Sequence, residues 1–283
     1  MCIRDRGNDI DESSLRKLVD WHISEGTDGI VPVGTTGESP TLNHDEHERV
    51  VEIVIDQCNK RVPVIAGTGS NSTAEAINLL KHAENAGADA ALVVTPYYNK
   101  PTPEGLYAHY EALDRASSGI PVIIYNIPSR SVIDINVDLM GRLSRLQSIV
   151  GVKDATSDIS RIKKHNELCE DGFIQLSGED ETIYEYMING GQGCISVTAN
   201  ILPKVCSDMH KAFSNNDLEE AKRLNNILMP LHKALFIETS PSPVKYILSK
   251  MNLIDYEIRL PLVKIRQETK SILDEITSNL EIK

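Results

Sequence analysis

The chain has 283 residues, of which 41% are hydrophobic and 25% are charged, a composition that excludes a globally disordered, collagenous or coiled-coil protein. Its formal net charge of -12 argues against binding to nucleic acid or to an anionic membrane surface. No apolar stretch reaches the roughly 18 residues that a membrane span needs, and residues 1–9 lack the apolar segment of a signal peptide, so we expect a cytoplasmic protein.

The chain opens on a predicted helix, and short apolar runs then recur along the sequence. The helix has an apolar face formed by Leu15, Leu18, Val19, Trp21 and Ile23. The runs cover residues 29–33, 62–66, 90–95, 121–125, 149–153, 173–176 and 194–197. Most of them are continuously apolar, which is typical of parallel strands covered on both faces. Between the runs, capping boxes at 43–46 and 72–75 predict helix starts.

This alternation predicts an α/β protein with a (β/α)8 TIM barrel in residues 1–200, and a helical region at 201–283 that completes and extends the barrel. Only seven strands can be counted, and residues 1–6 are too charged for a buried strand. We therefore expect the first barrel strand to be missing or replaced at the N-terminus. An open doubly wound sheet is the alternative fold.

In both folds the active site lies where strands end, and polar residues follow several of the predicted strands. The segment 34–39, Gly-Thr-Thr-Gly-Glu-Ser, could bind an anion through its amides and hydroxyls, or it could be an ordinary turn. Lys153 ends the run 149–153. In a partly dry pocket its neutral amine would be favoured and could attack a carbonyl to form an imine, whereas at the barrel rim it would be a solvated lysine.

Other candidate residues allow two interpretations each. Tyr125 either makes a structural hydrogen bond or transfers protons, and Arg130 either binds a carboxylate or is simply solvated. The pair Tyr97 and Tyr98 is typical of a packing or subunit contact. The acidic run 179–181 predicts a helix start.

No metal site is expected. His44 and His47 share a helix face, but no third ligand accompanies them. The five cysteines are scattered and lack C-x-x-C spacing, which predicts reduced thiols rather than disulfides or a zinc site.

Five motifs in order carry a resemblance to a known family. They are Gly-Thr-Thr-Gly-Glu-Ser, Val-Thr-Pro-Tyr-Tyr-Asn, Tyr-Asn-Ile-Pro-Ser-Arg, Gly-Val-Lys-Asp-Ala-Thr and Leu-Ser-Gly-Glu-Asp. Together they closely resemble the 4-hydroxy-tetrahydrodipicolinate synthase family of pyruvate-dependent class I aldolases. The resemblance implies a lyase of lysine and diaminopimelate biosynthesis that condenses pyruvate with L-aspartate 4-semialdehyde without a cofactor.

The resemblance also implies roles for residues of this chain. The catalytic set it implies is Lys153 as the Schiff-base lysine, with Tyr125, Thr35 and Tyr98 as a proton relay, Tyr98 coming from a neighbouring subunit. Substrate binding would fall to Thr36, Arg130, Gly178 and Ile195. Feedback inhibition by L-lysine would involve Ser39, Pro40, His44, His47, Asn71, Glu75 and Tyr97. The implied assembly is a homotetramer built from two tight dimers.

Three other functions remain as alternatives. The first is another enzyme of the same superfamily, such as N-acetylneuraminate lyase, against which Arg130 and the lysine-site residues count. The second is a non-catalytic barrel that binds pyruvate or lysine. The third is a phosphate-binding barrel, for which the sequence offers glycine turns but no accompanying basic residues.

Overall fold

The computed structural model describes residues 9–282, which fold into two compact units. The first unit comprises the described residues up to Pro63 and those from Ser196 onward, and its regular elements are helices. The second unit, Val64–Ile195, contains the strands of the sheet. The predicted replacement of the first barrel strand concerns residues 1–6, which lie outside the described residues.

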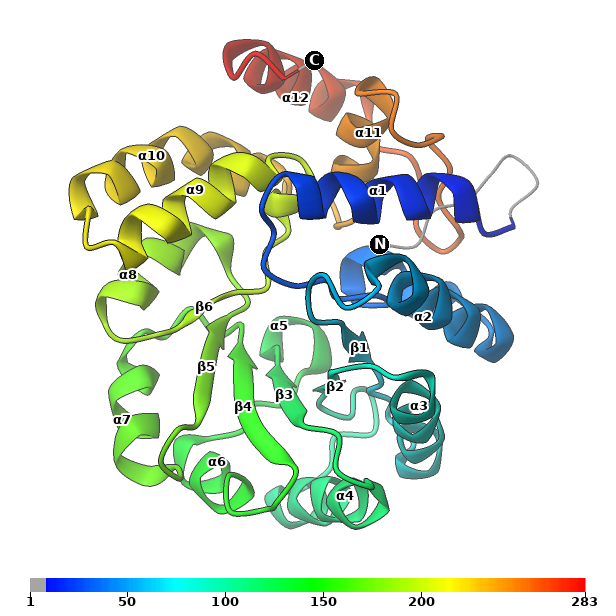
Figure 1. Cartoon of the computed structure of the whole chain (residues 1–283), viewed down its shortest axis with the longest axis vertical. Coiled ribbons are helices and arrows are strands. Elements are labelled where there is room, and N and C mark those ends of the chain that lie inside the picture. The colour runs from blue at the N-terminus through cyan, green and yellow to red at the C-terminus, as the bar shows by residue number, and fades with distance from the viewer. Residues whose placement is uncertain (1–8, 283) are drawn as a thin grey trace. The chain divides into compact units, whose positions relative to one another are not determined.

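The second unit is built on one parallel sheet of six strands in the order β1-β2-β3-β4-β5-β6. The strands are β1 (Ile65–Gly67), β2 (Ala90–Val94), β3 (Val122–Asn126), β4 (Ile149–Asp154), β5 (Ile174–Ser177) and β6 (Gly193–Cys194). Strand order follows chain order, with helices in the crossovers between successive strands, so all carboxyl ends lie at the same edge of the sheet (Figure 1).

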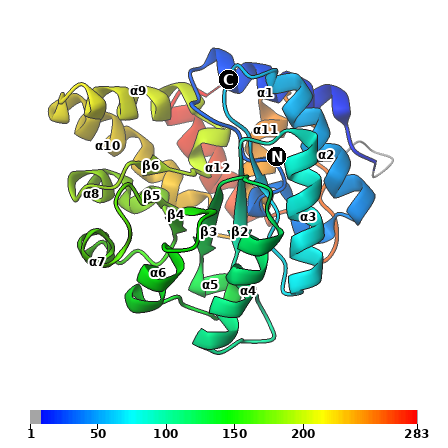
Figure 2. The ribbon, with the colours of Figure 1, turned by 60° about the horizontal axis from the view of Figure 1, so that its bottom comes forward.

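The helices of the second unit lie in the crossovers between successive strands. They are α3 (Thr73–Ala86), α4 (Pro103–Ala116), α5 (Pro128–Ser131), α6 (Val137–Leu143), α7 (Ser160–Leu168) and α8 (Ile183–Ile188), with a 3₁₀ turn, η3 (Asp180–Thr182), before α8. Helix α3 packs against α4, α4 against α6, and α6 against α7. Figure 2 shows α3, α4, α6 and α7 following the strands from β2 to β5.

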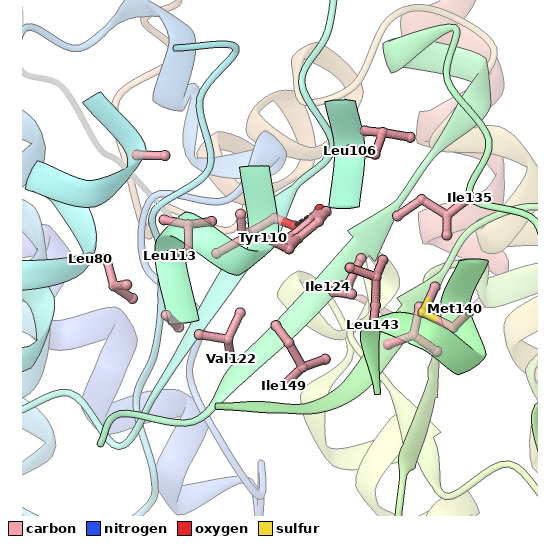
Figure 3. Close-up of a cluster of buried hydrophobic side chains, with 14 of the residues drawn as sticks. Leu80, Leu106, Tyr110, Leu113, Val122, Ile124, Ile135, Met140, Leu143 and Ile149 are labelled. Carbon is pink, nitrogen blue, oxygen red and sulfur yellow. Dashed lines mark hydrogen bonds between the residues drawn. The ribbon is translucent and has the colours of Figure 1, made fainter. Parts of the chain in front are cut away.

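An apolar core fills the space between the helices α3, α4 and α6 and the sheet (Figure 3). Tyr110 of α4 is completely buried in it and donates its hydroxyl to the carbonyl of Val93 at 3.2 Å. Burial raises the pKa of this phenol far above its usual range. Ile124 of β3 and Met140 of α6 pack in the same cluster. Because side chains alternate along a strand, Tyr125 points to the opposite face, away from this core.

The predicted strand at 29–33 is not formed. Within this segment, only the N–H of Ile30 is bonded in strand fashion, to the carbonyl of Pro63 at 3.0 Å. Pro32 has no N–H to donate, and Val33 adopts a left-handed φ of 48°, so an extended ladder cannot continue. The described sheet therefore has six strands where the sequence predicted seven.

Two other predicted strands have limits that are shifted by more than one residue. The run 62–66 becomes a strand only from Ile65 onward. The run 194–197 is extended only as far as Cys194, because Val197 already has the helical angles φ -86° and ψ -42°.

The first unit contains the N-terminal and C-terminal helices. They are α1 (Glu12–Ser24), α2 (His44–Cys58), α9 (Pro203–Ser214), α10 (Leu218–Ala234), α11 (Ser242–Lys250) and α12 (Gln267–Asn279), with the 3₁₀ turns η1 (Thr35–Gly37), η2 (Ser39–Thr41) and η4 (Thr198–Asn200). Among the described residues no helix is both long and apolar enough to cross a membrane. The predicted boundary after residue 200 stays a prediction.

The two predicted capping boxes differ in the structure. Asn43 and Glu46 form the complete reciprocal box at the start of α2. At the start of α3, Ser72 caps the N–H of Glu75, but the Glu75 carboxylate instead accepts a hydrogen bond from Ser70. Both helix starts are thus confirmed, and only the first has the predicted reciprocal pairing.

Candidate active site

A bulge in β4 sets the register between the two central strands. Val122 of β3 pairs with Ile149 of β4, but the next residue, Ile123, pairs with Gly151. Val150 is therefore one extra residue on β4. A bulge of this kind re-aims the side chains that follow it, and here it advances the rest of β4 by one position.

Because of this shift, Tyr125 pairs with Lys153 rather than with Val152. The Lys153 ammonium lies over the Tyr125 ring, with Nζ 4.1 Å from the ring centroid. Both side chains are buried, Lys153 being 8% and Tyr125 7% exposed. The two residues singled out at strand ends are thus brought into direct contact at the carboxyl edge of the sheet.

The absence of a side chain at Gly178 leaves room beside the lysine. A Cβ atom at Gly178 would lie 3.1 Å from Cε of Lys153, which is tighter than an ordinary contact. The N–H of Gly178 donates to the carbonyl of Asp154 at 2.7 Å, and the N–H of Ile195 donates to the carbonyl of Ser177 at 3.0 Å. Both residues therefore lie at the same sheet edge with their N–H groups already used by the backbone.

An acidic side chain with an altered pKa lies near this edge. Burial, with the neighbouring Asp180 carboxylate, raises the pKa of Glu179 to about 7, while the positive charges of Lys153 and Arg130 oppose the rise. Arg130 itself is exposed on α5. The acidic run 179–181 does begin the helical turn η3, as predicted, but the unusual environment of Glu179 was missed. Its position just after β5 is the signal that could have found it.

A buried ion pair between Arg161 and Asp154 lies at the carboxyl end of β4. Arg161 of α7 donates from Nε to the Asp154 carboxylate at 2.9 Å and from a second nitrogen to the carbonyl of Ile135. Asn126, which follows Tyr125 on β3, donates to Asp134 at 2.8 Å and accepts from the N–H of Ile135 at 3.1 Å. The ends of β3 and β4 are thus tied to the same loop. Asn126 and Asp154 lie within two of the quoted motifs but were given no role, and sequence reasoning did not single out Asp134 or Arg161.

The loop after β2 carries the two predicted aromatic residues. Tyr98 is 89% exposed with a left-handed φ of 71°, and Tyr97 is 37% exposed. Asn99 donates its amide to the carbonyl of Asn71 at 2.8 Å, which fastens this loop to the segment before α3. Glu75 lies in the first turn of α3. Three of the predicted effector residues, Asn71, Glu75 and Tyr97, therefore belong to one linked region of the second unit.

The remaining predicted residues lie in the first unit. Thr35 and Thr36 form the half-buried turn η1, and Ser39 and Pro40 begin η2 directly after it. Glu38, between the two turns, is buried and left-handed, with φ 55°. The hydroxyls of Thr35 and Thr36 and the predicted effector residues Ser39 and Pro40 therefore lie on one short stretch of chain.

His44 and His47 occupy the first turn of α2, the former exposed and the latter buried. Within residues 9–282, no group of three or more His, Cys, Asp or Glu side chains is arranged to hold a metal ion. The cysteines of the same residues, Cys58, Cys169, Cys194 and Cys206, form no disulfide with one another.

Comparison with known sequences identifies the family. The model of the dihydrodipicolinate synthetase family matches residues 4–280. A 4-hydroxy-tetrahydrodipicolinate synthase of Bradyrhizobium diazoefficiens is 56% identical over 265 residues, which are 94% of this chain and 89% of the relative.

Solved structures agree with the sequence comparison. The chloride-inhibited dihydrodipicolinate synthase of Acinetobacter baumannii, complexed with pyruvate, superposes with a TM-score of 0.97 at 47% identity, covering 100% of this chain and 97% of that chain. The enzyme of Cyanidioschyzon merolae with lysine bound gives a TM-score of 0.96 at 30% identity, covering 100% and 97%. These likenesses confirm the predicted TIM-barrel class with a C-terminal helical extension. With its lysine and tyrosine paired at the carboxyl edge of the sheet, this chain is an enzyme of the dihydrodipicolinate synthetase family.

Proposed function

We propose that the protein is a 4-hydroxy-tetrahydrodipicolinate synthase that condenses pyruvate with L-aspartate 4-semialdehyde through an imine on Lys153. The observation that carries this proposal is the buried contact between Lys153 Nζ and the Tyr125 ring, 4.1 Å apart, at the edge where TIM-barrel active sites lie. The neutral form of an amine is a nucleophile for a keto carbon, and an adjacent phenol can carry the protons that the reaction moves.

The chemistry proceeds in balanced steps. The neutral amine of Lys153 attacks the keto carbon of pyruvate, and water leaves to give an imine. Loss of a methyl proton gives an enamine, which attacks the aldehyde carbon of the semialdehyde. The amine of the semialdehyde then displaces Lys153, which returns the free lysine and closes the six-membered ring.

Proton transfer in this proposal uses Tyr125, Thr35 and Tyr98. Tyr98 is 89% exposed, and an exposed aromatic on a loop is suited to a contact with a second subunit. We therefore propose that Tyr98 enters the site of a neighbouring subunit and that activity needs at least a dimer. The family resemblance extends this to a homotetramer of two tight dimers.

Carboxylate binding uses a different set of groups. Thr36 and the adjacent backbone would hold the carboxylate of pyruvate, and the guanidinium of Arg130 would hold the carboxylate of the semialdehyde. Because the N–H groups of Gly178 and Ile195 are already bonded, these two residues would line the pocket through their carbonyl oxygens.

A turnover assay tests the proposal. The purified chain should convert pyruvate and the semialdehyde, and Tyr125→Phe should lower turnover by about 10²- to 10⁴-fold because it removes a positioned proton donor and acceptor. Tyr107→Phe, on the helix α4, is the matched control and should change turnover little. Activity on N-acetylneuraminate instead would favour the lyase alternative, and a folded chain that binds pyruvate without turnover would favour a non-catalytic barrel.

We also propose feedback inhibition by L-lysine at Ser39, Pro40, His44, His47, Asn71, Glu75 and Tyr97. The lysine-bound structure of the Cyanidioschyzon merolae enzyme supports this, as does the link between Asn71 and the Tyr97 loop. Glu75→Gln should weaken inhibition, since it removes the charge that would pair with an effector ammonium. Activity that does not change on titration with L-lysine would contradict the regulatory proposal alone.

A further inference from the structure

Glu38 is a fully buried carboxylate in the first unit. Its side chain is 0% exposed, and Lys245 of α11, 1% exposed, donates from Nζ to its Oε1 at 2.5 Å. The backbone N–H of Arg259 donates to the other oxygen, Oε2, at 3.1 Å. Both oxygens are therefore held by donors from the C-terminal part of the chain.

A buried ion pair of this kind calls for an explanation other than stability. Removing two charges from water has a large desolvation cost, and well-packed apolar residues of similar volume are often at least as stabilising. What an ion pair supplies beyond stability is a defined geometry, since its hydrogen bonds fix both partners in direction and distance.

The backbone of Glu38 is bonded directly to η1, the turn that contains Thr35 and Thr36. The N–H of Glu38 donates to the carbonyl of Thr35 at 3.1 Å and so closes η1. The carbonyl of Glu38 accepts from both the N–H and the hydroxyl of Thr41, each at 2.9 Å. Glu38 adopts the left-handed region, φ 55° and ψ 33°, which a residue with a side chain occupies when its surroundings hold it there.

The guanidinium of Arg259 makes a second attachment to the same segment. It donates to the carbonyl of Thr41 at 2.7 Å and to Glu46 at 2.6 Å. Glu46 belongs to the capping box of α2. The stretch from Thr35 to the start of α2 is thus fastened by Lys245 and Arg259 along its length.

We propose that Glu38, held by Lys245 and Arg259, is a positioning residue that orients the hydroxyls of Thr35 and Thr36 for the reaction. The proposal rests on the proposed function, because it assigns those hydroxyls to the proton relay and to the pyruvate carboxylate. The carboxylate touches no substrate and acts only by holding the turn. The C-terminal helical extension would thereby contribute to catalysis through α11 and the loop after it.

Glu38→Asp tests this role. The shorter side chain keeps the negative charge beside Lys245, but it cannot reach both donors while the turn stays in place. We expect turnover per trappable lysine to fall by about 10²-fold, the effect typical of a misplacement of about 1 Å. A trappable lysine is one that borohydride converts to a pyruvate adduct when pyruvate is saturating. Counting these adducts measures the fraction of chains in which Lys153, in the second unit, can form the imine.

A control and a second variant keep the test decisive. Glu220→Asp is the control, because it shortens another carboxylate that accepts two hydrogen bonds, from Arg223 at 2.6 and 2.7 Å, in an exposed pair. It should leave the turnover per trappable lysine within twofold of wild type. If Glu38→Asp does not fold, Lys245→Arg is the second variant. It keeps the positive charge but moves the donor that binds Glu38, and it should also lower the turnover per trappable lysine. Turnover per trappable lysine within twofold of wild type would overturn the proposal, because any lost activity would then reflect lost folded protein. Failure of the wild-type chain to be trapped or to turn over would instead contradict the proposed function.

Discussion

Two regions of the molecule carry the proposed chemistry, and they are built in different ways. Lys153 and Tyr125 are partners in one β ladder, where backbone pairing and one bulge decide which side chains meet. The turn of Thr35 and Thr36 is followed by Glu38, whose carboxylate accepts a hydrogen bond from Lys245, 207 residues further along the chain. Neighbouring strands set the ladder, whereas in our proposal the turn is held by charges that only the completed fold brings together.

The largest expected effect tests the turn. Lys245→Met should lower the free energy of unfolding by about 3–5 kcal/mol, because it leaves the Glu38 carboxylate buried without its cation. Urea unfolding followed by circular dichroism, at fixed protein concentration, measures the change.

Two comparisons show whether the unpaired charge is the cause. Lys204→Met breaks an exposed pair with Asp208 and should cost only about 0–1 kcal/mol. The double variant Glu38→Gln with Lys245→Met should recover much of the loss, since no buried charge remains. A Lys245→Met protein as stable as Lys204→Met would mean that the buried pair does not hold the turn.

A smaller effect is expected in the ladder. Gly151→Ala should cost about 1–3 kcal/mol by overpacking, because its Cβ would lie 2.5 Å from the carbonyl oxygen of Ile174. Adjustment of the bulge should also reduce imine trapping on Lys153. The quantities to compare are the unfolding free energy and the trapped fraction.

Gly193→Ala is the matched control in the same sheet. There a Cβ would meet Leu176 at 3.5 Å, an ordinary contact, so little change is expected. Equal stability and equal trapping for Gly151→Ala and Gly193→Ala would show that the bulge does not need glycine.

The smallest effect concerns Glu179 and pH. Its pKa rises from 4.5 to about 7 on folding, mainly through burial. Between these values the unfolded chain releases the proton and the folded chain keeps it, so stability falls as pH rises. We expect the unfolding free energy of wild type, relative to Glu179→Gln, to fall by about 1–2 kcal/mol over this window, since solvent screens a partly exposed group.

The difference in unfolding free energy between wild type and Glu179→Gln should be constant below pH 4.5 and again above about pH 7. Glu185→Gln changes an exposed residue of α8 and is the control. Its unfolding free energy should vary with pH in parallel with that of wild type. A wild-type stability that rises through the window relative to Glu179→Gln would contradict the raised pKa.

The sequence allowed the ladder to be predicted better than the turn. Continuous apolar runs ending in Tyr125 and Lys153 predicted parallel strands with chemistry at their ends, and the structure confirms both strands. The contact between the two side chains depends on the bulge at Val150, which no local pattern indicates. A register shift is settled by pairing between strands rather than by either strand alone.

The errors also lie where distant contacts decide the backbone. Residues 29–33 are apolar enough for a strand, but Pro32 and the left-handed Val33 turn the chain into the segment that Lys245 and Arg259 fasten. Partners so far along the chain share no spacing or motif with Glu38. Their pairing could be found only from the folded structure.

Reduction with borohydride in the presence of pyruvate tests the central claim most directly. An imine on Lys153 would be converted to a stable secondary amine, which intact mass and peptide mapping would locate. We predict one pyruvate adduct per chain, on Lys153, and none in Lys153→Arg, which keeps the charge over Tyr125 but cannot supply a neutral amine. A folded wild-type chain without an adduct, or with the adduct on another lysine, would contradict the account.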